Sequence, residues 1–420
     1  MSRVLELPYG KKKIVFDLPQ GWEPDFFRPK PISPAEDPIR EVMHSLDNPY
    51  GNRQLADFSG AASVAIAICD ETRPVPNHLI LPLLLKRLHQ IGISKSAIQI
   101  LIASGLHSPM AEARFADVLP PDLIRQYPIT VHDAVRSDLT FLGKTSRGTP
   151  VYVNRLFLDA ELRLVIGMID PHQFVGYTGG VKGAAIGLAG AQTIEANHSM
   201  LFHPQALIGE IQTNPVRQDI EEIGRMIGVH FVVDVVLDET DRIIKVFSGE
   251  PSEVERVGSE FCRGVYEIKV SKKYDMAIVS SGGYPKDINL YQAQKALASA
   301  TPLVRQGGDI LLFAECPEGL GDEVFYQTMR KHRSPQDVME SFRHQAFRMG
   351  LHKAFLWARS LIKVQVYVHS VLEEAVAYEL MVLPVKNTEA LLGRMKVKYV
   401  HPPQIAVIPK GNSTYMKPQG

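Results

Sequence analysis

Short, almost entirely apolar segments recur along this chain, and each is followed by polar residues and then by an amphipathic segment. Ser63–Cys69 (SVAIAIC), Ala97–Ala103 (AIQILIA) and Leu162–Ile169 are the clearest examples. Runs of about four to eight apolar residues are typical of strands buried on both faces of a parallel sheet. Because such strands alternate with helical patterns, the sequence predicts an α/β fold whose sheets are mostly parallel.

The alternation runs along most of the chain. The first ~60 residues are rich in proline and are expected to be irregular, apart from a strand over 12–18. Apolar periodicity predicts a hairpin over 231–247 and further strands over 276–280, 310–313, 364–368 and 405–408. Helices are expected over 77–91, 110–118, 191–200, 215–227, 251–265, 290–303, 325–332, 335–345, 351–362 and 388–395.

A chain of 420 residues exceeds one ordinary core, so we expect two domains. The polar junction Lys272–Tyr274 marks the boundary. We therefore predict a catalytic, cofactor-binding α/β domain over 1–272 and a smaller α/β domain over 273–403, with an active-site cleft between them. The last segment, 404–420, is expected to return to the first domain as a strand.

Composition narrows the function. Lys plus Arg and Asp plus Glu both number 46, so there is no basic excess of the kind that nucleic-acid partners require. No apolar stretch approaches the ~20 residues of a membrane span. The three cysteines form no CxxC pair, which disfavours disulfides and thiolate zinc sites and favours a reducing compartment. We see no signal-peptide pattern and expect a cytoplasmic enzyme.

Chemically active residues follow three of the predicted strands directly. In open α/β sheets ligands bind at the carboxyl ends of the strands, so these residues are expected to converge on one edge. A solvated loop surface remains an alternative for each residue taken alone. The residues concerned are Asp70, Arg73, His107, His172 and, further along the last loop, Lys182.

The last of these loops is rich in glycine and includes Tyr177-Thr178-Gly179-Gly180. It matches neither the P-loop, because Gly183 follows Lys182, nor the dinucleotide fingerprint. Its glycines would let backbone N–H groups approach a phosphate closely, and a flexible turn is the alternative.

Two residues around this loop have chemistry of their own. Lys182 lies among small residues, where a desolvated amine acts as a nucleophile or an attachment point, although an exposed lysine is the simpler interpretation. His198 lies on a predicted helix and is a candidate metal ligand, or else a structural histidine. In the second domain, Gln292 and Lys295 share one face of a predicted helix that follows Ser280–Gly283.

These motifs together resemble the nickel-pincer lactate racemase family. The matching residues are Asp70-x-x-Arg73-Pro74, Ser104-Gly105-x-His107, Asp170-Pro171-His172, Gly179-Gly180-x-Lys182, Asn197-His198 and Lys286-Asp287-x-x-x-Tyr291-Gln292-x-x-Lys295. The resemblance implies a racemase or epimerase, an isomerase that acts on lactate or a related 2-hydroxy acid by reversible hydride transfer. It also implies nickel held in a pyridinium-3,5-bisthiocarboxylic-acid mononucleotide.

The resemblance also implies a role for each residue. Lys182 would be joined to the cofactor and His198 would bind nickel, while His107 and His172 would be the acid–base pair. Asp70, Tyr177, Thr178, Gly179 and Gly180 would contact the cofactor. Arg73, Tyr291, Gln292 and Lys295 would bind the substrate.

The partners expected from this resemblance are the small 2-hydroxy acid and the enzymes that mature the cofactor. Neither a nucleic acid nor a membrane is expected as a partner. The chain could form a homo-oligomer. Two other functions stay in view. One is a pyridoxal-phosphate-type enzyme in which Lys182 forms a Schiff base. The other is a non-catalytic protein that binds a nucleotide or a metal.

Overall fold

The computed structural model describes residues 3–342 and 350–419, which form two compact units. The continuous unit is Pro31–Val265, and the split unit combines Met1–Lys30 with Tyr266–Gly420. Each unit is an α/β layered structure with a sheet of six strands, so the predicted fold class is confirmed. Across the described ranges no helix is both long enough and apolar enough to cross a membrane.

The sheet of the continuous unit has the strand order β13-β12-β9-β4-β5-β6. All neighbouring strands are parallel except β12 and β13, which form the predicted hairpin. The apolar runs that signalled the strands are buried almost without exception. The bounds are β4 (Val64–Cys69), β5 (Ile98–Ala103), β6 (Ile129–Val131), β9 (Leu162–Met168), β12 (Phe231–Leu237) and β13 (Ile243–Gly249).

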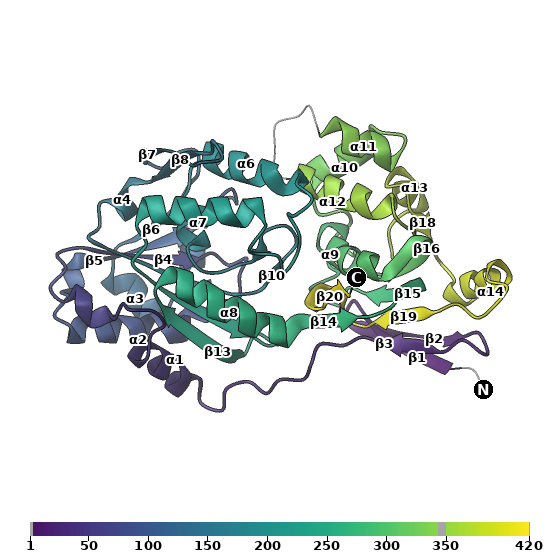
Figure 1. Cartoon of the computed structure of the whole chain (residues 1–420), viewed down its shortest axis with the longest axis horizontal. Coiled ribbons are helices and arrows are strands. Elements are labelled where there is room, and N and C mark those ends of the chain that lie inside the picture. The colour runs from purple at the N-terminus through teal and green to yellow at the C-terminus, as the bar shows by residue number, and fades with distance from the viewer. Residues whose placement is uncertain (1–2, 343–349, 420) are drawn as a thin grey trace. The chain divides into compact units, whose positions relative to one another are not determined.

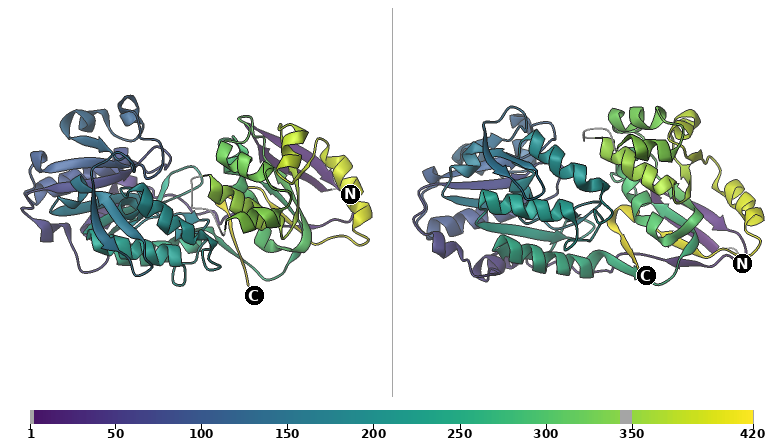
Figure 2. Two further views of the ribbon diagram at one scale, coloured as in Figure 1. Left: turned by 90° about the horizontal axis from the view of Figure 1, so that it is seen from above. Right: turned by 45° about the horizontal axis from the view of Figure 1, so that its top comes forward.

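Helices cover both faces of this sheet. α1 (Pro38–Asp47) and α2 (Asn77–Gln90) pack on the face that presents Ile66, Ile100 and Leu164. α7 (Pro215–Ile227) and α8 (Pro251–Tyr266) lie along the other face (Figures 1 and 2). Because both faces are covered, the polar ends of the strands are the parts of the sheet that remain accessible to a ligand.

The split unit has an entirely parallel sheet with the order β18-β17-β16-β15-β19-β3. The hairpin β1/β2 and α14 share a hydrophobic core with β15, β16 and β19, while α9 packs against β15 and β16. The bounds are β1 (Arg3–Tyr9), β2 (Lys12–Leu18), β3 (Pro24–Phe26), β15 (Tyr274–Ser280), β16 (Val304–Phe313), β17 (Gln365–His369), β18 (Leu383–Pro384), β19 (Ile405–Ile408), α9 (Leu290–Ala300) and α14 (Thr388–Lys398).

The predicted domain boundaries need two corrections. Residues 1–30 belong with the C-terminal part of the chain, because the apolar face of the β1/β2 hairpin packs on the split unit's sheet. The C-terminal strand does not return to the first domain either. β19 pairs in parallel with β15, with Val407 opposite Ile278, and so completes the second sheet.

Some local predictions were also wrong. The first ~60 residues are not irregular, because α1 begins there with Pro38 in its first turn and Asp37 accepting a hydrogen bond from the Arg40 N–H at 3.0 Å. The helix predicted over 110–118 is only a 3₁₀ helix over Glu112–Asp117, and the end of the helix predicted over 335–345 lies outside the described residues. The remaining elements are α3 (Pro121–Gln126), α4 (Arg155–Leu158), α5 (Lys182–Ala185), α6 (Ala191–Ser199), α10 (Glu323–Arg330), α11 (Pro335–Ser341), α12 (Leu351–Leu361), α13 (Glu374–Glu379), β7 (Leu139–Lys144), β8 (Pro150–Asn154), β10 (Pro171–His172), β11 (Gly176–Tyr177), β14 (Glu267–Val270) and β20 (Tyr415–Pro418).

Candidate functional site

Three loops with predicted site residues leave the same edge of the continuous unit's sheet. β9, β4 and β5 are neighbours and run parallel. In their register Cys69 lies opposite Ala103, and Ala67 opposite Val165, so the three strands end at similar levels. The loops that follow them therefore start side by side, as the sequence predicts. They carry Asp70, Arg73, His107 and His172.

Asp70 and His107 form a hydrogen-bonded pair. The His107 Nδ1 lies 2.7 Å from Asp70 Oδ2, and the Thr72 hydroxyl donates to Asp70 Oδ1 at 2.6 Å. Burial acts to raise the pKa of Asp70, but the hydrogen bonds from His107 and Thr72 outweigh it and hold that pKa below its ordinary value. Because an ionised carboxylate only accepts, Nδ1 of His107 carries the proton and Nε2 carries the lone pair.

His172 has the opposite arrangement at Nδ1. It lies on β10, which forms a small antiparallel hairpin with β11, and the Val175 N–H donates to His172 Nδ1 at 3.3 Å. A neutral His172 therefore carries its proton on Nε2. The Phe174 ring contacts the rings of both His172 and His198 edge to face, with centroids 4.7 and 5.2 Å apart. Phe174 thus packs the two predicted functional histidines around one aromatic ring.

The glycine turn is held from within the protein. The Gly180 N–H donates to Asp234 Oδ2 at 2.6 Å, and the Thr178 N–H donates to the Asp170 carbonyl at 2.9 Å. Gly180 has φ +59°, and a Cβ there would lie 2.9 Å from Arg217 Nη2, so the turn requires glycine. Two of the N–H groups that the sequence analysis assigned to the cofactor therefore already have acceptors.

A buried charged cluster anchors the same turn through its carbonyls. Arg217, fully buried on α7, donates to the carbonyls of Tyr177 and Gly179 at 3.2 and 3.4 Å. Its other terminal nitrogen, Nη2, pairs with Glu221 and Glu255 at 2.5 and 2.9 Å. Burial acts to lower the pKa of Arg217, but these carboxylates raise it above its ordinary value. The turn before Lys182 is thus fixed by hydrogen bonds at both its N–H and its C=O groups.

Lys182 follows this turn and begins the short helix α5. Removal from water, together with the positive charges of Arg73 and Arg217, lowers the pKa of Lys182 to about 8. Within residues 3–342 and 350–419 its ammonium makes no hydrogen bond or ion pair. About a tenth of Lys182 is therefore unprotonated at pH 7, far more than of an ordinary lysine, and the unprotonated amine is the form that reacts as a nucleophile.

His198 lies on α6 and is 9% exposed. Burial and the nearby charge of Lys182 lower the pKa of His198 to about 3. The imidazole is therefore neutral at physiological pH, which is the form that binds metals.

Three predicted substrate residues lie on α9 of the split unit. Asn289 caps this helix by accepting the Gln292 N–H at 3.0 Å, and Tyr291, Gln292 and Lys295 share a face that is not buried. The Lys353 ammonium lies 4.5 Å from the centroid of the Tyr291 ring, which fixes that ring. The structure thus groups these three residues with one another on a single helix.

Lys182 and His198 fit the nickel-carrying nucleotide that the resemblance implies. An amine with a lowered pKa suits covalent attachment, and a neutral imidazole supplies one nitrogen donor. In the described ranges no three His, Cys, Asp or Glu side chains gather as a metal site, and burial raises the pKa of Cys69 to about 11. These residues suit a metal that receives its other ligands from an organic group.

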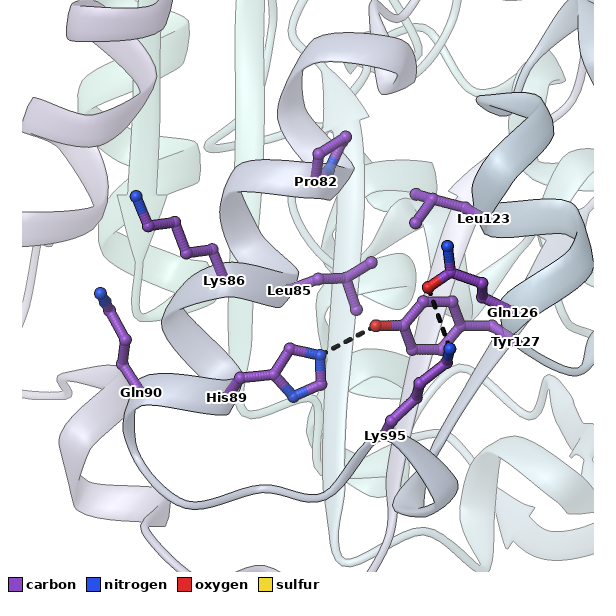
Figure 3. Close-up of a pocket in the computed structure, with 9 residues that line it drawn as sticks. All are labelled: Pro82, Leu85, Lys86, His89, Gln90, Lys95, Leu123, Gln126 and Tyr127. Atoms are coloured by element: carbon purple, nitrogen blue, oxygen red, sulfur yellow. Dashed lines mark hydrogen bonds between the residues drawn. The ribbon is translucent and has the colours of Figure 1, made fainter.

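A cavity of about 580 Å³ lies elsewhere in the continuous unit (Figure 3). His89 Nε2 is 2.9 Å from the Tyr127 hydroxyl, and Lys95 donates to Gln126 at 2.9 Å. Four of its polar side chains thus bond to one another in pairs, and none of the predicted site residues line it. The lining residues are Pro82, Leu85, Lys86, His89, Gln90, Lys95, Leu123, Gln126 and Tyr127.

Sequence reasoning missed the residues that hold the glycine turn. Asp234 interrupts the otherwise apolar strand Phe231–Leu237 (FVVDVVL), and a carboxylate in the middle of a buried strand is a detectable signal, because it needs a specific partner. Arg217 gives no such signal, since it occupies an ordinary position in an amphipathic helix. Apart from Glu221 on the same helix, its partners Tyr177, Gly179 and Glu255 come from segments distant in sequence.

Known proteins resemble this chain in sequence and in fold. Models of the lactate racemase N-terminal domain and of its C-terminal domain match residues 9–209 and 269–416. Proteins named lactate racemase from Thermoanaerobacterium thermosaccharolyticum and Lactiplantibacillus plantarum are 34% and 31% identical over 343 and 346 residues, with 80% of each chain covered. A solved structure of the lactate racemase apoprotein from the former organism has a TM-score of 0.90 and 30% identity, and covers 99% of this chain and 100% of that one. The resemblance read from the motifs is confirmed, and the chain belongs to the lactate racemase family of isomerases.

Proposed function

We propose that this chain racemises lactate or a closely related small 2-hydroxy acid, using a nickel-carrying pyridinium mononucleotide attached to Lys182. The observation that carries the proposal is the pair of histidines with opposite proton positions, His107 and His172, on loops beside a reactive amine. When bound, the organic group with its nickel supplies an acceptor and donor of hydride. The residues around it handle the protons and the substrate charge.

The hydroxyl proton is the first of these tasks. The α-hydrogen of a 2-hydroxy acid is barely acidic, so removal of the hydroxyl proton must accompany loss of hydride from C2. His107 suits this step because Asp70 holds the proton on Nδ1 and leaves the lone pair on Nε2. His172 returns a proton to the oxygen when the other enantiomer forms; it does so as the imidazolium, which donates its Nε2 proton and is left as a neutral ring. In the reverse direction the two rings exchange roles.

Binding of the carboxylate is the second task. We propose that Arg73 and Lys295 provide the positive charges, with Gln292 and Tyr291 as hydrogen-bonding neighbours. Charge-assisted hydrogen bonds hold a carboxylate in a fixed orientation, so the planar keto acid turns about a fixed anchor before its other face reacts.

The cofactor is the remaining part of the proposal. Lys182 forms the covalent link, His198 provides the nitrogen ligand to nickel, and dedicated maturation enzymes supply the modified nucleotide. The described cysteines are all free thiols, which favours the reducing conditions of the cytoplasm. The occupied N–H groups at Thr178 and Gly180 weigh against this turn as a phosphate cradle, both for pyridoxal phosphate and for the mononucleotide.

The deciding experiment uses lactate that carries deuterium at C2. Enzyme produced together with the maturation enzymes is incubated with each labelled enantiomer in ordinary water, and the product is analysed by mass spectrometry. Racemised lactate should retain its deuterium, because hydride passed to the bound group and back does not exchange with solvent. Loss of the label in step with racemisation would contradict the proposal and indicate removal of the α-hydrogen as a proton.

A further inference from the structure

Asn197 connects His198 to a carboxylate that the proposed function does not use. The Asn197 amide nitrogen donates to the Val216 carbonyl at 3.1 Å and to Asp219 Oδ2 at 2.9 Å. The amide oxygen of Asn197 lies 3.0 Å from His198 Nδ1. Asn197 and Asp219 are both fully buried, so water does not compete for these groups.

The chemistry of these partners fixes which atom of the amide faces which side. A backbone carbonyl and a carboxylate can only accept, so the side of Asn197 that faces Val216 and Asp219 must be its NH₂ group. Its oxygen is then the atom that faces the imidazole. Because an amide oxygen only accepts, the His198 Nδ1 must be the donor. The neutral ring therefore carries its proton on Nδ1 and its lone pair on Nε2.

Asp219 is itself held in place by two hydroxyl groups. Thr145 donates to Asp219 Oδ1 at 2.6 Å, and Thr149 donates to Oδ2 at 2.9 Å. Both threonines lie in the turn between β7 and β8, which is closed by the hydrogen bond from the Thr145 N–H to the Thr149 carbonyl at 3.0 Å. The Thr149 N–H donates to the Thr145 hydroxyl oxygen at 3.1 Å, so the Thr145 proton is directed to Asp219. The carboxylate thus has a fixed position on α7.

We propose that Asp219, acting through Asn197, is a positioning residue that holds His198 in the Nδ1–H tautomer and so makes Nε2 the metal-binding nitrogen. The part of this inference that concerns the metal rests on the proposed function, whereas the tautomer does not. Partners of this kind behind a metal-binding histidine fix both the orientation and the tautomer of the ring.

The first test measures the tautomer in the apoprotein. Protein labelled with ¹⁵N at histidine is studied by long-range ¹H–¹⁵N correlation, and the His198 signals are assigned by their absence in His198→Gln. We expect a protonated Nδ1 and an unprotonated Nε2. An Nε2–H tautomer in the wild-type apoprotein would overturn the proposal, and this result depends on no variant of Asn197 or Asp219.

The second test measures retention of nickel in the loaded protein under a chelator. In Asn197→Leu the ring loses its acceptor, so we expect nickel to leave about 10–100-fold faster than from wild type. Thr193→Val is the matched control, because Thr193 is also buried on α6. Its hydroxyl accepts the Tyr152 N–H at 2.8 Å and lies 2.7 and 3.4 Å from the Pro150 and Tyr152 carbonyls, but within the described residues it makes no hydrogen bond to Asn197. The control should retain nickel within about threefold of wild type.

The outcomes separate the two hypotheses. If His198→Ala loses its nickel while Asn197→Leu retains it like the control, the positioning role of Asn197 and Asp219 is wrong. If His198→Ala itself retains nickel, the metal assignment in the proposed function is wrong, together with the part of the inference that concerns the metal. The tautomer measured in the apoprotein would still stand in that case.

Discussion

Replacing Asp234 with asparagine should change how the stability of the continuous unit depends on pH. Asp234 is fully buried on β12, and its Oδ2 accepts the Gly180 N–H at 2.6 Å. Its Oδ1 is buried with no hydrogen-bond partner among the described residues. Burial raises the pKa of Asp234 to about 7, which the Gly180 hydrogen bond and Arg217 offset only in part. Asp234→Asn keeps the shape and an acceptor but cannot ionise.

The magnitude follows from linkage. An unfolded aspartate titrates near 3.8, so between that pH and about 7 the folded protein holds a proton that the unfolded chain has lost. The wild-type free energy of unfolding therefore falls as pH rises through this window, by about 1.4 kcal/mol per pH unit. Between pH 5 and pH 8 the wild-type free energy of unfolding falls only up to about pH 7, so the total fall is roughly 2–3 kcal/mol. Asp234→Asn does not lose stability in this way. Between pH 5 and pH 8 its free energy of unfolding should therefore rise by roughly 2–3 kcal/mol relative to that of wild type.

Urea denaturation of the apoprotein at pH 5 and pH 8 measures the effect. Both tryptophans of the chain, Trp22 and Trp357, belong to the split unit, so tryptophan fluorescence follows that unit alone. Far-ultraviolet circular dichroism follows both units, and the transition absent from fluorescence belongs to the continuous unit. Asp122→Asn, at a side chain 76% exposed, is the matched control and should not alter the pH dependence.

The reasoning fails if the stability difference between Asp234→Asn and wild type is the same at pH 5 and pH 8. A change in the opposite direction would mean that the folded protein stabilises the ionised carboxylate, as it does at Asp70. A shift of the fluorescence transition would show that the substitution changes the stability of the split unit, and this would also contradict the reasoning.

Three further predictions concern the site. In the loaded enzyme Asp70→Asn should lower kcat by about 10²–10⁴-fold with the adduct mass unchanged, because the His107 tautomer is no longer fixed; loss of the adduct would instead make Asp70 a cofactor-binding residue. Acylation of Lys182 in the apoprotein, followed by peptide mass spectrometry, should rise with pH around 8, whereas an ordinary lysine would respond near 10.4. His198→Ala should retain the organic adduct but lose nickel in metal analysis, and full nickel occupancy would refute its role as the ligand.

The sequence alone could locate the edge of the sheet where the chemistry lies. Buried parallel strands can be recognised in the sequence as apolar runs, and the residues that follow each run lie at the carboxyl edge of the sheet. Asp70, His107 and His172 could therefore be grouped without a structure. Which proton each histidine carries could not be predicted. That depends on Asp70 for one ring and on the Val175 N–H for the other, and no spacing rule encodes either contact.

The sequence also could not show which of the two sheets certain strands join. The alternation of apolar and polar residues in Lys12–Leu18 shows that one face of this strand is buried, but not which sheet buries it. The same holds for Ile405–Ile408, whose four buried residues suit a central strand in either unit. Only packing decides between the two sheets, and it assigned both segments to the split unit, against the prediction.

The split unit cannot be completed until almost the whole chain has been synthesised. Phe26 on the edge strand β3 pairs with Val407, 381 positions later. At ~5–20 residues per second, a ribosome needs about 20–75 s to cover that interval. Leu5, Leu7 and Phe16 lack the strands β15 and β16, which cover them in the finished protein, until residues 274–313 have been made. The apolar face of the N-terminal hairpin therefore stays uncovered on the nascent chain while the whole of the continuous unit, residues 31–265, is synthesised.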